Sequence, residues 1–449
     1  MKDNYLPQAL YWFTYSILAL FVLSVIPPFT VGSFTYKQIN LLADIEPEMI
    51  IQQPDSLVDS LDVITPIVKH RSDTCRKGVT CIEDFSAEGN AMEAFVKSLG
   101  QVQTKPVRIA FFGDSFIEGD IMTSSLRDTL QRVFGGRGVG YVPITSEVAQ
   151  FRTTIKHAFS NWKTYSIVEK FDEEPRFGIG GFCFEPEDGN LVEFSLGYGA
   201  WLNRLSLFYS GSAPRNLSYL IRDTVTVDTV LYPSTSLTRI DLTNLRSKSI
   251  LIKIAQSDSL QFFGASVEDN SGIYVDNLAV RGNSGIALSR ISSYMLRETN
   301  RVRPYRLVIL QFGLNVVSET DSIQYSGYTE SMIRVVNKFK ESFTDCSILV
   351  VSVSDRSSNQ NGSFKTIPGI LAMRQAQRLI AKKTGVAFWD LFAAMGGENS
   401  MPKFVNAKPA MAAKDYTHLN FKGGKFVARR LSDALLYEQE KYVKSPTAF

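Results

Sequence analysis

Apolar and polar positions follow two different periods along the chain, and the change of period divides it into segments. Over residues 105–146 and 272–449, short apolar runs alternate with stretches in which apolar residues recur every three or four positions. The first apolar run is Val107 to Phe112, and helical spacing begins near Asp120. Buried strands that alternate with amphipathic helices indicate a parallel sheet with helices on both faces.

Four further strands are predicted after residue 272. They occupy residues 273–280, 307–312, 347–353 and 386–389, and helices are expected between them and over residues 424–438. The polar residues 355–365 are interpreted as a loop on the ligand side of the sheet. This order of elements predicts a doubly wound α/β/α domain that occupies residues 105–146 and 272–449.

A different period holds between residues 147 and 271. Apolar residues alternate with polar or small ones, as at Phe194, Leu196 and Tyr198, and clusters of turn residues separate these runs. Such runs indicate short antiparallel strands, so we expect an inserted all-β sandwich or jelly-roll module over residues 147–271. Trp162 and Trp201 are expected in its core, with stacking on a sugar ring as the alternative.

The N-terminal segment is predicted to anchor the chain in a membrane. Residues 10–29 contain no charged side chain and match the length of about 20 residues that crosses a bilayer as a helix. A cleaved signal peptide and a buried helix are the alternatives, but the preceding segment is nearly neutral and has no evident cleavage site. We therefore expect an anchor over residues 1–29, followed by a tether with short helices over residues 30–104.

Composition narrows the classes of function. Of the 449 residues, 44% are hydrophobic and 21% are charged, and the net charge is +3. This is ordinary globular composition, and no dense Lys/Arg run with interleaved aromatic residues occurs. Nucleic-acid binding is therefore not expected.

The four cysteines predict one disulfide and no metal site. None of them forms a C-x-x-C pair, which argues against zinc and thioredoxin-like chemistry. Cys75 and Cys81 lie six positions apart in a polar segment, where they can close a small disulfide loop outside the cytoplasm. Cys183 and Cys346 lie in apolar runs and are expected to be buried free thiols.

Three predicted strands end in polar turns that contain glycine: Gly113-Asp114-Ser115, Arg281-Gly282-Asn283 and Gly313-Leu314-Asn315. The carboxyl ends of parallel strands form one edge of the sheet, where ligands bind in open α/β folds. Ser115 lies between a strand end and a helix start, so its hydroxyl can attack a carbonyl while backbone N–H groups hold the oxyanion. A plain turn is the alternative, because Gly, Asp and Ser are common turn residues.

A histidine base for this serine has few possible sources. The chain contains three histidines, His70, His157 and His418, and Asp415 precedes the last by three positions. One turn of irregular backbone can place this carboxylate on the imidazole and leave the other ring nitrogen free. An imidazole with the ordinary histidine pKa of about 6.5 is neutral enough near pH 7 to accept a proton. We therefore predict Ser115, His418 and Asp415 as nucleophile, base and orienting acid.

These blocks, in this order, resemble those of the SGNH hydrolases, also called the GDSL esterase/lipase superfamily. The matching residues are Gly113-Asp114-Ser115, Gly282, Gly313-x-Asn315 and Asp415-x-x-His418. The resemblance covers about residues 105–146 and 272–449 and implies a three-layer, flavodoxin-like SGNH domain. It implies Ser115 as nucleophile, His418 as base and Asp415 as its orienter, with neither a cofactor nor a metal ion.

The same resemblance implies an oxyanion hole. Its donors would be the backbone N–H groups of Ser115 and Gly282 and the side-chain amide of Asn315, with Gly285 as a rival to Gly282. Phe116 replaces the leucine of the GDSL name, which leaves the nucleophile untouched.

A narrower likeness concerns the substrate. The block from Gly113 to Asp120 resembles that of bacterial peptidoglycan O-acetylesterases, which also carry a β module between the first two blocks. That subfamily often has histidine after the serine, and Phe116 departs from this pattern, so the substrate stays open.

The expected activity follows from this resemblance. It implies a serine esterase that removes acetyl or other small acyl groups from an acylated polysaccharide or peptidoglycan through an acyl-enzyme. The uncharged N-terminal run adds the membrane anchor, and the Cys75–Cys81 pair and the expected substrate favour a catalytic domain outside the cytoplasm. The alternative is a glycan O-acetyltransferase that uses the same site with a membrane-bound acyl donor protein. A glycan-binding or scaffold protein with an inactive site is a third class, and the reactive residue types present in all four blocks argue against it.

Overall fold

The structure, a computed structural model, describes four long segments of the chain. These are residues 75–197, 200–255, 259–319 and 325–444, together with Tyr11, Tyr15 and the backbone of residues 29–31 and 34–36. The predicted membrane segment over residues 10–29 thus lies almost entirely outside the described residues. Within the parts that are described, no helix has both the length and the apolar character needed to cross a bilayer.

The chain divides into two units, Met1–Ile67 and Val68–Phe449. In the first unit, the described elements are two short antiparallel strands, β1 (Phe29–Val31) and β2 (Phe34–Tyr36). All the residues predicted to carry chemistry belong to the second unit.

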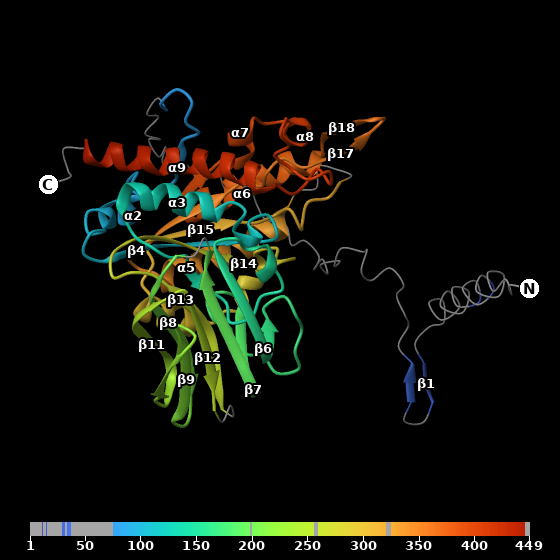
Figure 1. The fold of residues 1–449 in the computed structure, drawn as a ribbon. Coiled ribbons are helices and arrows are strands. Elements are labelled where there is room, and N and C mark those ends of the chain that lie inside the picture. The colour runs from blue at the N-terminus through green and yellow to red at the C-terminus, as the bar shows by residue number, and fades with distance from the viewer. Residues whose placement is uncertain are drawn as a thin grey trace, which may run out of the picture. The chain divides into compact units, whose positions relative to one another are not determined.

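A six-stranded sheet forms the centre of the second unit (Figure 1). Its order is β14 (Gly272–Ala279), β4 (Pro106–Gly113), β15 (Leu307–Gln311), β16 (Ser347–Val351), β19 (Ala387–Trp389) and β3 (Ile82–Asp84). The first five strands are parallel, and β3 pairs antiparallel with β19 at the edge. This confirms the predicted parallel sheet. The spatial order of the five parallel strands, β14-β4-β15-β16-β19, is flavodoxin-like.

Helices cover both faces of this sheet. On one face α2 (Glu93–Leu99), α3 (Thr123–Phe134) and α9 (Phe421–Val443) pack together, and α4 (Ser293–Val302), α5 (Ser326–Ser342) and α6 (Pro368–Thr384) pack together on the other. Short helices α7 (Leu391–Met395) and α8 (Ser400–Asn406) follow β19. Because both faces are covered, every residue of β15 and β16 is buried, which explains their unbroken apolar runs.

An antiparallel β module lies between β4 and β14 in sequence and forms the lower part of Figure 1. One half contains β6 (Ile155–Ser166), β7 (Phe182–Leu196), β12 (Ser249–Ile254), β9 (Arg215–Ile221) and β10 (Val225–Leu231). The other half contains β5 (Gly140–Val142), β13 (Leu260–Val267), β8 (Leu202–Gly211) and β11 (Ser234–Ser247). The two halves belong to one nine-stranded sheet and are joined where Phe262 of β13 pairs with Phe184 of β7. Apolar side chains from both halves, such as Phe194 and Leu205, meet in one cluster, so the sheet folds over on itself in the manner of a sandwich.

A buried ion-pair network joins this module to the parallel sheet. Glu268, directly after β13, accepts hydrogen bonds from Arg108 of β4 at 2.6 Å and from Arg303 at 2.7 Å. Arg303 also pairs with Asp276 of β14 at 2.8 Å. These four side chains are at most 5% exposed, so each charge depends on its partners for compensation.

Two local elements depart from the sequence predictions. Residues 82–84, within the segment interpreted as a tether, form the edge strand β3, which is too short to show a period. The predicted loop over residues 355–365 contains a hairpin, β17 (Ser357–Gln360) and β18 (Ser363–Thr366). Its strands are polar because much of the hairpin is exposed, which hides them from a search for buried runs.

The cysteines follow the prediction closely. Cys75 and Cys81 form a disulfide that closes a loop of six positions before β3. Cys183 is a buried free thiol, whereas Cys346 is only partly buried. The described residues thus contain one disulfide and two free cysteines.

Candidate active site

Ser115 lies just after the carboxyl end of β4. The strand ends at Gly113, and the chain then turns so that Phe116 and Ile117 are buried beneath the turn. The Asn277 side chain donates a hydrogen bond to the Ile117 carbonyl at 2.7 Å, which ties this turn to β14. The apolar Phe116 therefore has a packing role, and Ser115 is left half-buried at the edge of the sheet.

The Ser115 hydroxyl contacts the imidazole of His418. Ser115 Oγ lies 3.0 Å from His418 Nε2, although the two residues are 303 positions apart. On the other side of the ring, His418 Nδ1 lies 2.7 Å from Asp415 Oδ2. When Nδ1 carries the ring proton and its N–H donates a hydrogen bond to the carboxylate, Nε2 is free to accept the serine proton. The fold thus brings the three predicted residues into hydrogen-bonding contact.

The loop that carries this pair precedes α9 and is fixed by its own hydrogen bonds. Asp415 Oδ1 accepts hydrogen bonds from the backbone N–H groups of Thr417 at 2.9 Å and His418 at 3.0 Å. The His418 carbonyl in turn accepts one from the Ala413 N–H at 2.8 Å. Tyr416, between the acid and the base, has a left-handed backbone with a φ of 55°. Such a conformation persists only where surrounding contacts hold it.

The same hydrogen bonds set the ionisation of the acid. Burial tends to raise the pKa of Asp415, but hydrogen bonds from His418 and Thr417 outweigh it, and the pKa lies below the ordinary aspartate value. The carboxylate is therefore ionised at neutral pH, as it must be to stabilise an imidazolium. The side chains of Asp415 and His418 are 49% and 40% exposed, so water screens part of this attraction.

The predicted oxyanion donors gather at the same edge of the sheet. Among the described residues, neither the Ser115 nor the Gly282 backbone N–H has a hydrogen-bond acceptor. The Asn315 amide does: its Nδ2 lies 3.1 Å from Asp114 Oδ2 and 3.2 Å from the Asn283 carbonyl. An oxyanion would therefore compete with the Asn283 carbonyl for an Asn315 hydrogen.

The structure distinguishes Gly282 from its rival, Gly285. A Cβ atom at Gly285 would lie 2.9 Å from the Phe312 ring and from the Met332 sulfur, so this glycine is required by packing. Gly282 is exposed, has a φ of 73° and faces open space, with no atom within 4 Å of an added Cβ. The Gly285 N–H already donates to Asn283 Oδ1 at 2.8 Å, whereas the Gly282 N–H has no acceptor among the described residues and remains accessible to a ligand.

Asp114 is a site residue that the sequence prediction did not single out. Its side chain is fully buried and accepts hydrogen bonds from the Phe116 N–H at 2.9 Å and from Asn315 Nδ2. Burial raises the pKa of this carboxyl to about 6, although the Phe116 N–H opposes the shift. Its position next to Ser115 was the available signal, but aspartate is so common in turns that its sequence position alone does not reveal this contact.

The β17–β18 hairpin forms a second unpredicted feature of the site. Its Phe364 ring stacks on the Tyr416 ring with 3.5 Å between centroids and 3° between planes. The Ser357 N–H at the base of the hairpin donates to the Tyr416 carbonyl at 3.1 Å. Two contacts therefore join the hairpin to Tyr416, one of the two residues between Asp415 and His418.

The other histidines take no part in this arrangement. His157 lies in the β module, where its Nε2 lies 2.6 Å from the Ile144 carbonyl and its ring stacks on Phe194. Burial lowers the pKa of His157 to about 4, so it is neutral in a structural role. His70 lies outside the described residues. Within the described segments, no group of three or more His, Cys, Asp or Glu side chains is arranged to hold a metal ion.

Comparisons with known proteins support the fold. A solved structure of a peptidoglycan O-acetylesterase is similar with a TM-score of 0.67 and 23% sequence identity, over 80% of this chain and 99% of that one. This likeness confirms the fold that the resemblance to SGNH hydrolases implied. No protein-family model and no curated protein sequence matches the chain.

Two weaker structural likenesses involve other ester-cleaving proteins. A family two carbohydrate esterase from Clostridium thermocellum, in complex with cellohexaose, has a TM-score of 0.26 and 10% identity over 56% of this chain and 93% of its own. An acetyl xylan esterase has a TM-score of 0.28 and 16% identity over 36% of this chain and 81% of its own. Both scores are too low to support a conclusion about this protein.

Proposed function

We propose that this protein is a serine esterase of the SGNH type that removes acetyl or another small acyl group from a cell-envelope glycan. The observation that supports this most directly is the continuous hydrogen-bonded series from Ser115 through His418 to Asp415. Its fold, which is similar to that of a peptidoglycan O-acetylesterase, adds support for an acylated polysaccharide or peptidoglycan as substrate.

The first half of the proposed reaction forms an acyl-enzyme. Ser115 Oγ attacks the ester carbonyl carbon, and its proton moves to His418 Nε2. The carbonyl oxygen becomes an oxyanion that accepts hydrogen bonds from the Ser115 and Gly282 N–H groups and from Asn315 Nδ2. Collapse of this intermediate breaks the bond to the sugar oxygen, which leaves with the proton held by His418.

The second half releases the acyl group. Water gives a proton to His418 Nε2 and attacks the acyl carbonyl carbon, so that a second oxyanion forms in the same place. Its collapse breaks the bond to Ser115 Oγ, which regains the proton, and the acid product leaves. Asp415 keeps its charge throughout and stabilises the imidazolium in both halves.

The proposed location is outside the cytoplasm, with the chain held at a membrane by residues 1–29. The Cys75–Cys81 disulfide supports an oxidising compartment, because such bonds are rare where thiols are kept reduced. The uncharged run over residues 10–29 supports the anchor.

The decisive experiment measures turnover of an aryl acetate by the wild-type chain and by Ser115→Ala. We expect release of acetate by the wild type and loss of roughly 10³-fold or more of the activity in the variant. Ser124→Ala on α3 is a suitable control, because it also removes one partly buried serine hydroxyl. Equal activity of wild type and Ser115→Ala would exclude the proposal.

The same assay with a glycan acceptor tests the alternative, an O-acetyltransferase supplied by a membrane-bound acyl donor protein. In that enzyme the acyl group on Ser115 passes to a sugar hydroxyl instead of water. Acetylated glycan with little free acetate would identify a transferase. Absence of turnover with and without acceptor would favour a glycan-binding protein with an inactive site.

A further inference from the structure

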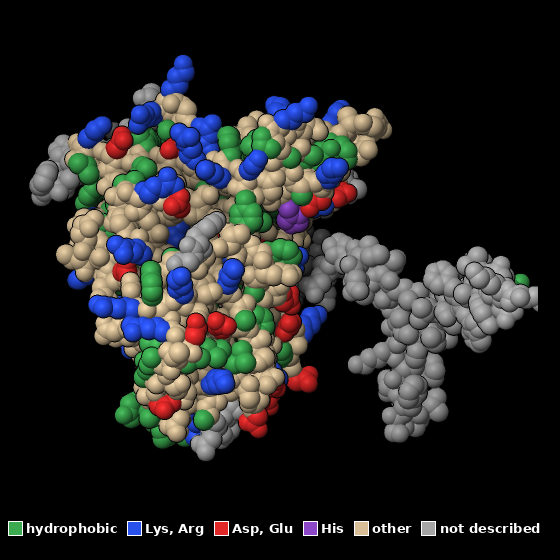
Figure 2. All heavy atoms as spheres, viewed as in Figure 1, with side chains coloured by type: hydrophobic (Ala, Val, Ile, Leu, Met, Phe, Trp, Pro, Cys, Tyr) green, Lys and Arg blue, Asp and Glu red, His purple; other side chains and the backbone are tan. Residues whose placement is uncertain are grey.

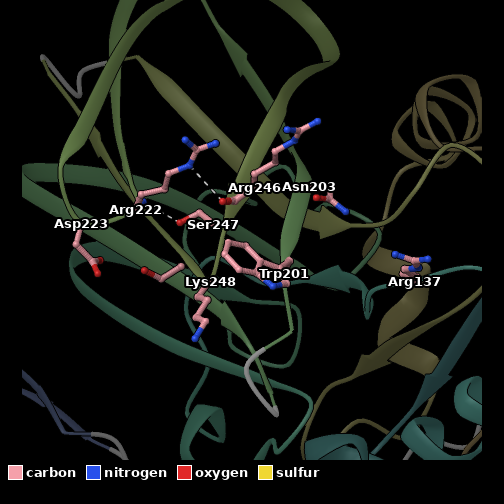
Figure 3. A pocket seen from close by; sticks show the side chains of 9 residues that line it. Arg137, Trp201, Asn203, Arg222, Asp223, Arg246, Ser247 and Lys248 are labelled. Carbon is pink, nitrogen blue, oxygen red and sulfur yellow. Dashed lines mark hydrogen bonds between the residues drawn. The ribbon is translucent and has the colours of Figure 1, made fainter.

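A cavity of about 790 Å³ is lined mainly by residues of the β module (Figure 3). It is lined by Arg137, Trp201, Asn203, Arg222, Asp223, Arg246, Ser247, Lys248 and Ser249. Cavities of about 300–1,000 Å³ are typical of small-molecule sites. Its size is therefore sufficient for a ligand of one or a few sugar rings.

The cavity is far from Ser115. Arg137 follows α3, and the nearby Gly135 carbonyl accepts a hydrogen bond from the Ile273 N–H at the amino end of β14. Ser115 and Gly282 lie at the opposite, carboxyl end of the strands. At about 3.3 Å per residue, an eight-residue strand such as β14 spans roughly 25 Å. A ligand in this cavity therefore does not occupy the Ser115 site.

The lining is strongly basic. It includes four cationic side chains and one carboxylate, that of Asp223. Figure 2 shows that both basic and acidic side chains occur on the visible face of the molecule. A concave site lined by one sign of charge focuses its field on ligands of opposite charge.

Three of these cations are available to an anion. Arg222, Arg246 and Lys248 are exposed, and within the described segments none has a carboxylate within ion-pair distance. The Arg222 Nε donates to the Arg246 carbonyl at 3.3 Å, and the Arg222 N–H donates to Ser247 Oγ at 2.8 Å, as Figure 3 shows. These bonds fix the position of Arg222 while most of its guanidinium donors stay accessible.

The backbone under these side chains has unusual conformations. Arg222, Asp223 and Arg246 have φ values of 53°, 58° and 41°, in the left-handed region that non-glycine residues rarely adopt. Arg246 lies where the pairing of β11 with β8 shifts register, and such irregularities redirect side chains. Arg222 and Asp223 lie in the turn between β9 and β10, where Ile221 pairs with Val225, and tight hairpin turns require positive φ. The turn and the register shift together place these side chains at the edge of the cavity.

Trp201 provides an aromatic surface beside these cations. The sequence prediction assigned it to the core, but it is 60% exposed, because it lies just before β8 and not within it. Trp162, by contrast, is partly buried, and its Nε1 donates to the Leu191 carbonyl at 2.9 Å. A large exposed indole next to a cavity is available to cover one face of a ligand ring.

We propose that this cavity is a second binding site, specific for an acidic saccharide. One face of a sugar ring packs on Trp201, and the carboxylates of successive rings bind Arg222, Arg246 and Lys248. Guanidinium groups suit this role because they bind carboxylates with two parallel hydrogen bonds. Asn203, Asp223 and Ser249 line the same cavity and can bind sugar hydroxyl groups.

Two features favour a saccharide over single-stranded nucleic acid. The cavity contains one aromatic side chain, whereas sites for single strands generally stack successive bases on several aromatic residues. The cations are also confined to a concave site and do not follow a long groove. The proposal does not depend on esterase activity, because binding is measurable without turnover.

Binding of polygalacturonate to the full-length chain tests the proposal. We expect Trp201→Ala to weaken binding about tenfold and the triple change of Arg222, Arg246 and Lys248 to Gln to abolish it. Dextran, which is neutral, should not bind. Tyr232→Ala and Lys253→Gln are matched controls, because both side chains are exposed on the module but do not line the cavity. Both controls should bind as the wild type does.

Other outcomes would overturn the proposal. Tighter binding of oligothymidylate than of polygalacturonate would indicate a nucleic-acid site. If Trp201→Ala binds polygalacturonate as tightly as the wild type, the basic side chains attract polyanions in general and the cavity is not a saccharide site. If the triple variant does not fold, as judged by its thermal midpoint, Lys248→Gln alone should still weaken binding severalfold, because Lys248 makes no ion pair within the described residues.

Discussion

The buried Asp114 carboxylate accepts a hydrogen bond from the Asn315 side chain, with 3.1 Å between Oδ2 and Nδ2. A carboxylate can only accept, so this contact determines which end of the Asn315 amide faces Asp114. The Asn283 carbonyl, 3.2 Å from the same nitrogen, adds a second acceptor. Asp114 therefore positions the one side chain in the proposed oxyanion hole, although it is not itself placed to contact the acyl group.

This relationship predicts the effect of Asp114→Asn. The two carboxylate oxygens of Asp114 accept from the Phe116 N–H and from Asn315 Nδ2, but an amide has only one oxygen. Its NH₂ group must therefore face one of these two donors. If it faces Asn315, rotation of the Asn315 amide by half a turn removes the clash between donors. The rotated amide would direct its oxygen to the oxyanion. We expect kcat for an aryl acetate to fall roughly 100-fold or more with a smaller change in KM, since loss of one oxyanion-hole donor typically costs about that much.

Asp128→Asn is the control for this change. Asp128 also lies near the nucleophile in sequence, but its side chain is 65% exposed on α3. It should leave kcat unchanged. An Asp114→Asn enzyme with wild-type kcat would show that Asn315 needs no such partner, and its role in the oxyanion hole would then need to be reconsidered.

The ionisation of Asp114 predicts a dependence of stability on pH. Burial raises its folded pKa to about 6 from an ordinary value of 3.8. Between these values the folded protein binds more protons than the unfolded one, so stability falls as pH rises from 4 to above 6. The shift of about two pKa units corresponds to an effect on the order of 3 kcal/mol.

Urea unfolding at pH 4.5 and pH 7.5 measures this effect. Because Asp114→Asn cannot ionise, it should become more stable relative to the wild type as pH rises across this range. The measured quantity is the difference in unfolding free energy between the wild type and Asp114→Asn, because the titration of all other groups is common to both and cancels. A constant difference in unfolding free energy at the two pH values would contradict the raised pKa.

The buried network around Glu268 predicts the opposite dependence of stability on pH, because stability should fall as pH decreases. Burial tends to raise the pKa of Glu268, but Arg303 and Arg108 outweigh it and lower the pKa to about 2. The stabilisation from this carboxylate is thus present above its ordinary value of 4.5 and is lost as pH falls from there towards 2. The wild type should therefore lose stability in this acidic range.

Glu268→Gln tests the network directly at neutral pH. The change leaves the buried Arg108 without a carboxylate partner, whereas Arg303 keeps its pair with Asp276. We expect the unfolding free energy to fall by about 3–5 kcal/mol, because a buried charge is left uncompensated. Glu93→Gln breaks an exposed pair with Lys97 on α2 and should cost less than about 1 kcal/mol. Similar losses in the two variants would mean that water reaches the network and compensates its charges.

Sequence reasoning located the candidate site because its signals are local. Ser115, Gly282 and Asn315 each follow an apolar run, and the geometry of a parallel sheet brings strand ends to one edge whatever the details of packing. The contact of Asp114 with Asn315 joins residues 201 positions apart and leaves no local pattern. The exposure of Trp201 depends on which neighbouring strands cover it, which period alone does not specify.

The stacked rings of Phe364 and Tyr416 lead to a final prediction, which concerns the hairpin. Tyr416 lies between the proposed acid and base, and its left-handed backbone, with a φ of 55°, requires support from neighbouring groups. Phe364→Ala removes the stacked ring, so the loop should sample conformations in which His418 lies farther from Ser115. We expect kcat to fall about three- to tenfold, since small displacements of a catalytic group slow the reaction.

A positioning role for Phe364 differs from a purely structural one in its measurable consequences. Phe364→Tyr keeps the ring and should restore the wild-type kcat, whereas Phe364→Leu keeps only apolar bulk and should not. The thermal midpoint should change little in all three variants, because the Phe364 side chain is 37% exposed and contributes little to the core. If Phe364→Leu were as active as the wild type, ring stacking would not be needed to position His418. The hydrogen bond from the Ser357 N–H to the Tyr416 carbonyl would then be the contact through which the hairpin supports this loop.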